Sequence, residues 1–145
     1  MDASQLAAED YASADRAQQL LADRFNGAPS LYRQMKSWED FVVEVEKGYD
    51  TTWVWEYHSE IGCRDWLHEA LPMLTSAMQM LCKRRIDELD ARYRAATGPA
   101  KELNALVGRR PTRDRWWRDR YPLLIDHDED IPLPPSWSPA PTRIA

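Results

Sequence analysis

The chain has 145 residues, 43% of them hydrophobic and 30% charged, which is ordinary for a globular protein rather than a disordered one. Its formal net charge of −5 argues against a protein that coats nucleic acid with its whole surface, although a local basic patch would still be able to bind. No apolar run reaches the roughly 18 residues that span a bilayer, and the N-terminal sequence lacks the pattern of a secretory signal. We therefore expect a cytoplasmic protein with no membrane partner.

The two cysteines, Cys63 and Cys82, are expected on one continuous helix. At a rise of about 1.5 Å per residue they lie roughly 28 Å apart, which is too far for an intramolecular disulfide. We interpret both as free thiols, in agreement with a reducing cytoplasm. Cys82 is expected to be an inert core residue, because burial raises the pKa of a thiol.

The first part of the chain predicts two helices separated by a turn. The first helix spans residues 4–25 and is followed by Gly27. The second spans residues 38–47, after a short helical turn at 30–36, and ends at Gly48. Apolar residues recur on one side of each helix at spacings of three, four or seven: Ala7, Tyr11, Ala14, Leu21 and Phe25 in the first, and Trp38, Phe41, Val42 and Val45 in the second.

Residues 51–58, Thr-Thr-Trp-Val-Trp-Glu-Tyr-His, fit two patterns. Strict alternation places Trp53, Trp55 and Tyr57 on one side of a strand. Helical spacing places Trp53, Tyr57 and Ile61 together instead. We favour a helix capped by Asp50 or its neighbour, because the sequence offers no second convincing strand for pairing.

The strongest helical pattern runs from about residue 63 to residue 97, where Thr97-Gly98-Pro99 predicts a stop. Pro72 lies inside this pattern and is expected to kink the helix, or to split it, because it removes one backbone hydrogen bond. A straight helix of this length measures about 50 Å, so we expect it to project from the domain or to be shared with a second subunit. The apolar stripe consists of Leu67, Leu71, Leu74, Met78, Cys82, Ile86, Leu89 and Tyr93.

The C-terminal third predicts two short helices and a tail. The helices cover residues 99–107 and 112–121. The tail, residues 131–145, contains five prolines and no periodicity, so we expect an extended, mobile arm unless Trp137 docks on its own domain or in an aromatic-lined groove of a partner.

The fold class that follows is all-α: a single-domain helical bundle of about five to six helices at residues 1–130. The bundle is built around the Pro72-kinked helix at about residues 63–97. An extended proline-rich arm follows at residues 131–145.

The sharpest local feature is an Arg- and Trp-rich segment at residues 109–121. It carries six arginines and two aspartates, a local charge of +4. Arginine forks bind phosphates and tryptophan faces stack on bases, so one interpretation is a nucleic-acid site. We favour a segment whose rings dock on the core while its arginines are solvated or pair with the acids at 126–130, and an acidic protein partner is a further possibility. The candidate binding residues are Arg109, Arg110, Arg113, Arg115, Trp116, Trp117, Arg118, Arg120 and Trp137.

A second group, around His58, Cys63 and His68, contains residue types that bind metals. Its spacing is unfavourable, because residues five positions apart lie on different sides of a helix. We therefore predict no metal, no cofactor and no catalytic residue, and rank a small enzyme or metal-binding protein third among the functions.

The function that these patterns favour is a non-enzymatic protein-interaction or adaptor protein that acts through helical and Trp-rich surfaces. Its expected partner is a protein, and a second copy of the chain is one candidate. The alternative is a nucleic-acid-binding accessory protein that uses the Arg- and Trp-rich segment at residues 109–120.

Overall fold

The computed structural model describes residues 6–25, 27, 29–100, 115–126 and 132–144. Helices account for 66% of these residues. The chain divides into two compact units, each built from two separate stretches of sequence. Unit 1 comprises Met1–Glu39 and Gly62–Asp90, and unit 2 comprises Asp40–Ile61 and Ala91–Ala145.

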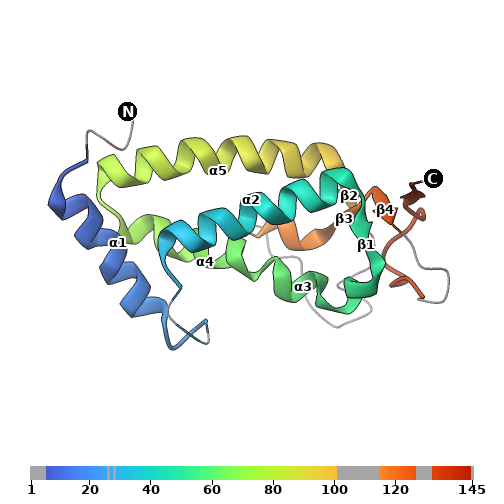
Figure 1. Ribbon diagram of the computed structural model, residues 1–145, viewed down its shortest axis with the longest axis horizontal. Coiled ribbons are helices and arrows are strands. Elements are labelled where there is room, and N and C mark those ends of the chain that lie inside the picture. The colour runs from blue at the N-terminus through green and yellow to red at the C-terminus, as the bar shows by residue number, and fades with distance from the viewer. Residues whose placement is uncertain (1–5, 26, 28, 101–114, 127–131, 145) are drawn as a thin grey trace. The chain divides into compact units, whose positions relative to one another are not determined.

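Unit 1 is helical in its described part. Helix α1 (Ala8–Leu21) packs against α4 (Gly62–Ala70) and against the 3-10 turn η3 (Leu71–Met73), as Figure 1 shows. Two longer helices, α2 (Leu31–Lys47) and α5 (Ser76–Ala96), contribute residues to both units. The core of unit 1 is formed by Ala17, Leu21, Trp38, Trp66, Leu67, Leu74, Met78, Cys82, Ile86 and Leu89.

A buried ion pair lies inside this core. The guanidinium of Arg64 on α4 donates to both carboxylate oxygens of Asp90 on α5, from Nε at 3.0 Å and from Nη2 at 2.9 Å. The indole Nε1 of Trp38 on α2 donates to the same carboxylate at 3.1 Å. All three side chains are buried, so three helices are tied at one point by charge-assisted hydrogen bonds.

Replacement of this carboxylate tests how much unit 1 depends on it. Asp90→Asn is expected to lower the free energy of unfolding by about 3–5 kcal/mol, because it leaves the buried guanidinium without its counter-charge. Asp87→Asn, at an exposed position of the same helix, is the control and is expected to change it by less than about 0.5 kcal/mol. Urea denaturation measures both. Equal unfolding midpoints for the two variants would contradict the dependence on Asp90.

A second polar cluster joins the start of α1 to the start of α5. Asp10 accepts a hydrogen bond from the backbone N–H of Ala7 at 2.7 Å and from the Thr75 hydroxyl at 2.5 Å. The backbone N–H of Thr75 donates to the Ser13 hydroxyl at 3.2 Å. Asp10 and Ser13 are both buried. The buried side of α1 is therefore partly polar, and hydrogen bonding makes that burial tolerable.

These contacts hold the pKa of Asp10 below its ordinary value, chiefly through the Thr75 hydroxyl and then through the Ala7 N–H. A carboxyl with a lowered folded-state pKa stabilises the fold above its unfolded-state pKa, and the stabilisation is lost as the pH falls through the folded-state value. Asp10→Asn is therefore expected to lower the Tm at pH 7, with a difference that shrinks below about pH 4. Thermal unfolding of both proteins at pH 7 and pH 3 measures this. A difference that does not change with pH would contradict it.

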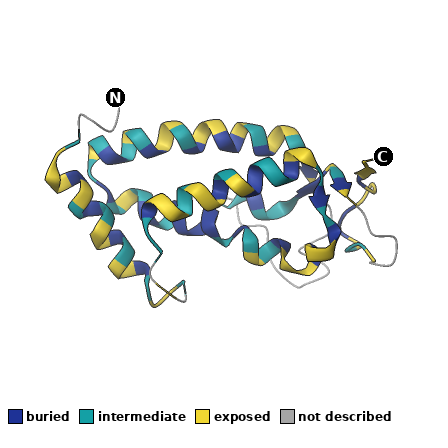
Figure 2. Ribbon diagram, viewed as in Figure 1, coloured by how far each residue is buried: buried dark blue, intermediate teal, exposed yellow. Residues whose placement is uncertain are grey.

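The pattern at residues 63–97 forms two helices, so the prediction of one kinked helix is wrong. Helix α4 ends at Ala70, and Leu74 has extended backbone (φ −86°, ψ 155°) before α5 begins. Pro72 cannot donate a helical hydrogen bond, and the Thr75 hydroxyl accepts from the N–H of Met78 and starts a new helix. The predicted stop is confirmed, since α5 ends at Ala96. Figure 2 shows buried residues on one side of α5 and exposed residues on the other.

Within the described residues, unit 2 contains a small parallel sheet that the sequence did not predict. Strands β1 (Tyr49–Asp50), β4 (Leu124–Asp126) and β5 (Thr142–Arg143) lie in the order β1–β4–β5, with Tyr49 opposite Ile125. Gly48, at the end of α2, has a φ of +119°, which lets the chain turn from the helix into β1. Each strand pairs with a segment distant in the sequence, so no local alternation signals it.

The predicted helix at residues 112–121 is wrong in its described part. A 3-10 turn, η4 (Trp116–Asp119), leads into β3 (Arg120–Pro122), which pairs antiparallel with β2 (Thr97–Pro99). Proline disfavours helical backbone in the residue before it, so Tyr121 is extended. The other predicted helix, at 99–107, lies outside the described residues from residue 101 onward.

Residues 51–60 are helical, as predicted for their first part. They form a 3-10 helix, η2 (Thr51–Glu56), and a single α-helical turn, α3 (Tyr57–Glu60). The side chain of Asp50 accepts from the N–H of Thr52 at 2.9 Å and so caps the start. Two large rings, Trp53 and Trp55, remain exposed.

Aromatic side chains form the core of unit 2. The hydroxyls of Tyr57 and Tyr93 lie 2.7 Å apart, and Tyr93 also donates to the carbonyl of Trp117 at 3.0 Å. Phe41 packs edge-on against Tyr57, with ring centroids 5.2 Å apart. Trp137 packs edge-on against Tyr57 at 5.4 Å. Trp137 of the proline-rich segment therefore lies in this core. Strand β5 adds Thr142 and Arg143 of the same segment to the sheet.

The fold is thus mostly helical, as predicted, but it differs from the expected bundle. Four helices of nine or more residues are described (α1, α2, α4 and α5), fewer than the five to six predicted, and short strands are present. None of the described helices is long and apolar enough to cross a bilayer.

Candidate functional site

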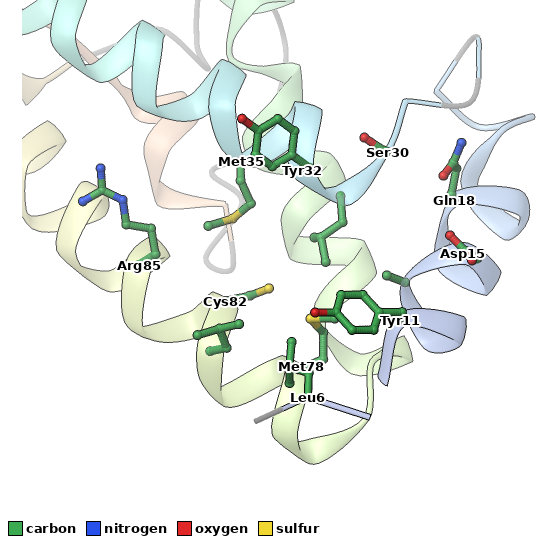
Figure 3. Close-up of a pocket in the computed structure, with 13 residues that line it drawn as sticks. Leu6, Tyr11, Asp15, Gln18, Ser30, Tyr32, Met35, Met78, Cys82 and Arg85 are labelled. Carbon is green, nitrogen blue, oxygen red and sulfur yellow. The ribbon is translucent and has the colours of Figure 1, made fainter. Parts of the chain in front are cut away.

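An open groove lies in unit 1. It is bordered by α1, by the first turns of α2 and by α5, and its volume is about 450 Å³. Figure 3 shows side chains from these three helices pointing into it. Its apolar lining consists of Leu6, Ala14, Leu31, Met35, Met78, Leu81 and Cys82. A volume of this size fits a small ligand or a few side chains of another protein.

Two tyrosines stand at the edge of the groove. Tyr11 on α1 is 51% exposed and Tyr32 on α2 is 78% exposed. Figure 3 shows Tyr11 beside Met78, and Tyr32 beside Met35. Tyrosine offers a large apolar ring with one polar atom, and methionine adapts its shape to a partner, which is why both are common at binding surfaces.

The exposed position of Tyr11 corrects the prediction for the first helix. The sequence stripe placed Ala7, Tyr11 and Ala14 with Leu21 on the buried side, whereas the buried residues of α1 are Asp10, Ser13, Ala17 and Leu21. The polar contacts of Asp10 and Ser13 with Thr75 hold that side inward. As a result, Tyr11 and Ala14 turn toward the groove.

Charge in the groove lies on its two walls. Among the described lining residues, Asp15 on α1 is the one acidic side chain and Arg85 on α5 the one basic side chain. Figure 3 shows them on opposite sides of the groove. Arg85 is held by Glu88 at 2.9 Å and by Glu39 at 3.3 Å, whereas no ion pair joins Asp15 to another described residue. The groove is therefore apolar along its length with one acidic wall.

The thiol in the groove is chemically quiet. Burial raises the pKa of Cys82 to about 11, in line with the expectation of an inert core residue. The pKa of Cys63, on α4, is raised to about 12, also by burial. Neither cysteine forms a disulfide and both are buried, so at neutral pH both are protonated and poor nucleophiles.

The described arginines of the Arg- and Trp-rich segment make internal contacts. Arg118 donates to the carbonyl of His58 at 3.1 Å. Arg120 donates to the hydroxyl and the carbonyl of Thr97 at 2.7 and 2.8 Å, next to the end of α5. The guanidinium of Arg94 lies 3.8 Å over the ring of Trp116. These contacts stabilise unit 2 and occupy some of the N–H donors of Arg118 and Arg120.

The tryptophans predicted to bind a partner are wholly or partly buried within unit 2. Trp117 and Trp137 are buried in the aromatic core of unit 2, and Trp116 is half-buried. Arg115 is half-buried as well, whereas Arg109, Arg110 and Arg113 lie outside the described residues. Binding of nucleic acid or of an acidic protein by this segment stays a prediction.

His58, Cys63 and His68 are the residues whose types pointed to a metal site in the sequence. Among the described residues, no three histidine, cysteine or carboxylate side chains come together as metal ligands. His68 is half-buried on α4, while Cys63 belongs to the core of unit 1.

Carboxylates surround a tyrosine hydroxyl in unit 2. Tyr49 Oη lies 2.7 Å from the carbonyl oxygen of Trp53, to which it donates, and 3.3 Å from Glu60 Oε2. Partial burial, followed by the charge of Glu44, raises the pKa of Glu60 to about 7. The arrangement makes this part of the fold sensitive to pH.

A carboxyl with a raised folded-state pKa costs stability once the unfolded chain ionises. The cost of Glu60 therefore grows from about pH 4.5 and is complete above about pH 7. Glu60→Gln is expected to raise the Tm at pH 8 and to leave it unchanged at pH 4. The control is Asp126→Asn, an exposed carboxyl of the same unit. Thermal unfolding at both pH values measures the effect, and a Tm for Glu60→Gln equal to that of wild type at pH 8 would contradict it.

No known protein family, no curated protein and no solved structure matches the chain. The sequence did not predict the groove of unit 1. The pattern that could have indicated it was the apolar stripe of α1 with Tyr11 and Ala14, which we assigned to the buried side of the helix.

Proposed function

We propose that the protein is a non-enzymatic protein-interaction or adaptor protein, and that the groove of unit 1 receives an apolar helix face of a protein partner. The observation that carries the proposal is the open apolar groove of about 450 Å³ between three helices, with two exposed tyrosines at its edge. Grooves of this kind bind amphipathic helices through apolar side chains at successive turns.

The chemistry of the lining supports binding rather than catalysis. Of the two charged residues described there, Arg85 is already paired with two glutamates. The Cys82 thiol is protonated at neutral pH. General acid–base catalysis needs a titratable group within hydrogen-bond reach of the reacting proton and with a pKa near neutrality. The described lining offers a hydrophobic surface instead, and hydrophobic surface is what drives association between proteins.

The free thiols support a cytoplasmic location as part of the same proposal. Cys63 and Cys82 are both unpaired by disulfide. Chains in oxidising compartments usually bridge their cysteines. We therefore propose that the protein meets its partner in the reducing cytoplasm.

Site-specific photo-crosslinking in cells that express the full chain tests the proposal. A benzophenone amino acid replaces Tyr32 at the groove edge, and in the control it replaces Ser37, an exposed residue of the same helix that does not line the groove. Irradiation is expected to give a protein adduct at position 32 and none at position 37. Mass spectrometry identifies the partner in the adduct.

A groove-filling variant makes this test specific. Ala14→Arg places a long charged side chain in the groove and is expected to abolish the adduct at position 32. Gln19→Arg, at an exposed position of α1 outside the groove, is the matched control and is expected to leave the adduct unchanged. Failure to form any protein adduct at position 32, or persistence of the adduct in Ala14→Arg, would remove the proposal.

A further inference from the structure

The groove is bordered by apolar side chains of its own unit that project into solvent. Tyr32, at 78% exposure, is the most exposed large apolar residue described, and it stands at the edge of the groove. A second hollow, of about 330 Å³, lies on α5 and shares Leu81 with the groove. Met80, which is 64% exposed, also lines it. One copy therefore carries both a projecting ring and an apolar surface able to receive it. Both features lie on unit 1, so the ring of one copy and the groove of another are a candidate pair of contact surfaces.

The charges beside the groove are of opposite sign on its two walls. Asp15 lies on the α1 wall. Across Leu81, the second hollow on α5 is lined by Lys83, Arg84 and Asp87, all exposed, so its charged side chains sum to +1. A partner that fits must offer positive charge to α1 and negative charge to α5. The chain itself offers this pair of charges when two copies face each other with their grooves reversed.

A two-fold axis produces this reversal. In an isologous dimer the same surface of both copies meets, so that if residue i contacts residue j, then j contacts i. The axis places α1 of one copy over α5 of the other, so that Asp15 faces Lys83 and Arg84 in both halves of the interface. Charge complementarity between α1 and α5 then occurs twice in one arrangement.

We propose that the occupant of the groove is a second copy of this chain, which inserts Tyr32 into the groove and receives the Tyr32 of its partner. This inference rests on the proposed function, because it names the protein partner. Tyr11, Tyr32 and Met80 of both copies form the apolar centre of the interface, and Asp15 with Lys83 and Arg84 forms its polar rim. Such a division between an apolar centre and a charged rim is usual for protein interfaces.

Light scattering after gel filtration measures the oligomeric state of the purified full chain. The wild type is expected at twice the 16.9 kDa mass of one chain. Tyr32→Ala removes the projecting ring at an exposed position and is expected to raise the dissociation constant of the dimer at least about tenfold. Ser37→Ala, on the same helix outside the groove, is the control and keeps the wild-type value.

A charge exchange tests the orientation. Asp15→Lys alone, and Lys83→Glu with Arg84→Glu in a second protein, each place like charges opposite one another in both halves of the dimer. Each is expected to raise the dissociation constant at least about tenfold. An equimolar mixture of the two proteins restores opposite charges in both halves, so it is expected to dimerise like the wild type. All three positions are exposed or line the groove surface, and circular dichroism of each protein checks that it is folded.

Two results would overturn the inference: a wild-type protein that is monomeric at 100 µM, or a dimer whose affinity is unchanged in Tyr32→Ala and in both charge variants. Dimers weakened by each charge variant but not restored on mixing would overturn the two-fold arrangement. These failures are separate from failure of the proposed function. A monomeric protein that still gives an adduct with a different protein at position 32 keeps the proposed function and loses the self-association.

Discussion

The buried carboxylate of Asp90 is the constraint on which unit 1 depends. It accepts hydrogen bonds from Arg64 on α4 and Trp38 on α2 while it is itself part of α5. A charge in this position is tolerable only when its partners keep their geometry, so the three helices must approach one another in one way. Apolar packing alone would allow many small adjustments, whereas this cluster selects one of them. The groove is bordered by α2 and α5 as well as by α1, so the arrangement of α2 and α5 at Asp90 helps to set its shape.

Helix α1 is attached to this frame by a different kind of contact. Its inward side carries Asp10 and Ser13, which bond to Thr75 at the start of α5. Because polar residues occupy the inward side, the apolar residues Tyr11 and Ala14 are left for the outward side. The apolar groove is thus a consequence of how the helix is held. One orientation of α1 therefore both buries the polar side chains of Asp10 and Ser13 and exposes the ring of Tyr11.

The sequence predicted what depends on local pattern. The stripe of Trp38, Phe41, Val42 and Val45 is buried, and the stops at Gly48 and after Ala96 are confirmed. It could not predict features that depend on distant partners. The short strands pair with segments far along the chain. Pro72 is compatible with either a kinked helix or two separate helices, and the sequence did not decide between them. The polar side of α1 is buried only because Thr75 lies opposite it. The groove belongs to this second class, because a stripe does not reveal which of its residues another helix will cover.

The two sides of α1 answer to different demands. Substitutions at Asp10 or Ser13 act on folding, since those side chains are internal, whereas substitutions at Tyr11 or Ala14 alter a surface and leave the internal contacts in place. Under the proposed function, a few surface positions on this one helix decide what the groove binds. At Tyr11 solubility and binding then place opposite demands on the side chain, because a polar residue favours solubility and an aromatic ring favours binding.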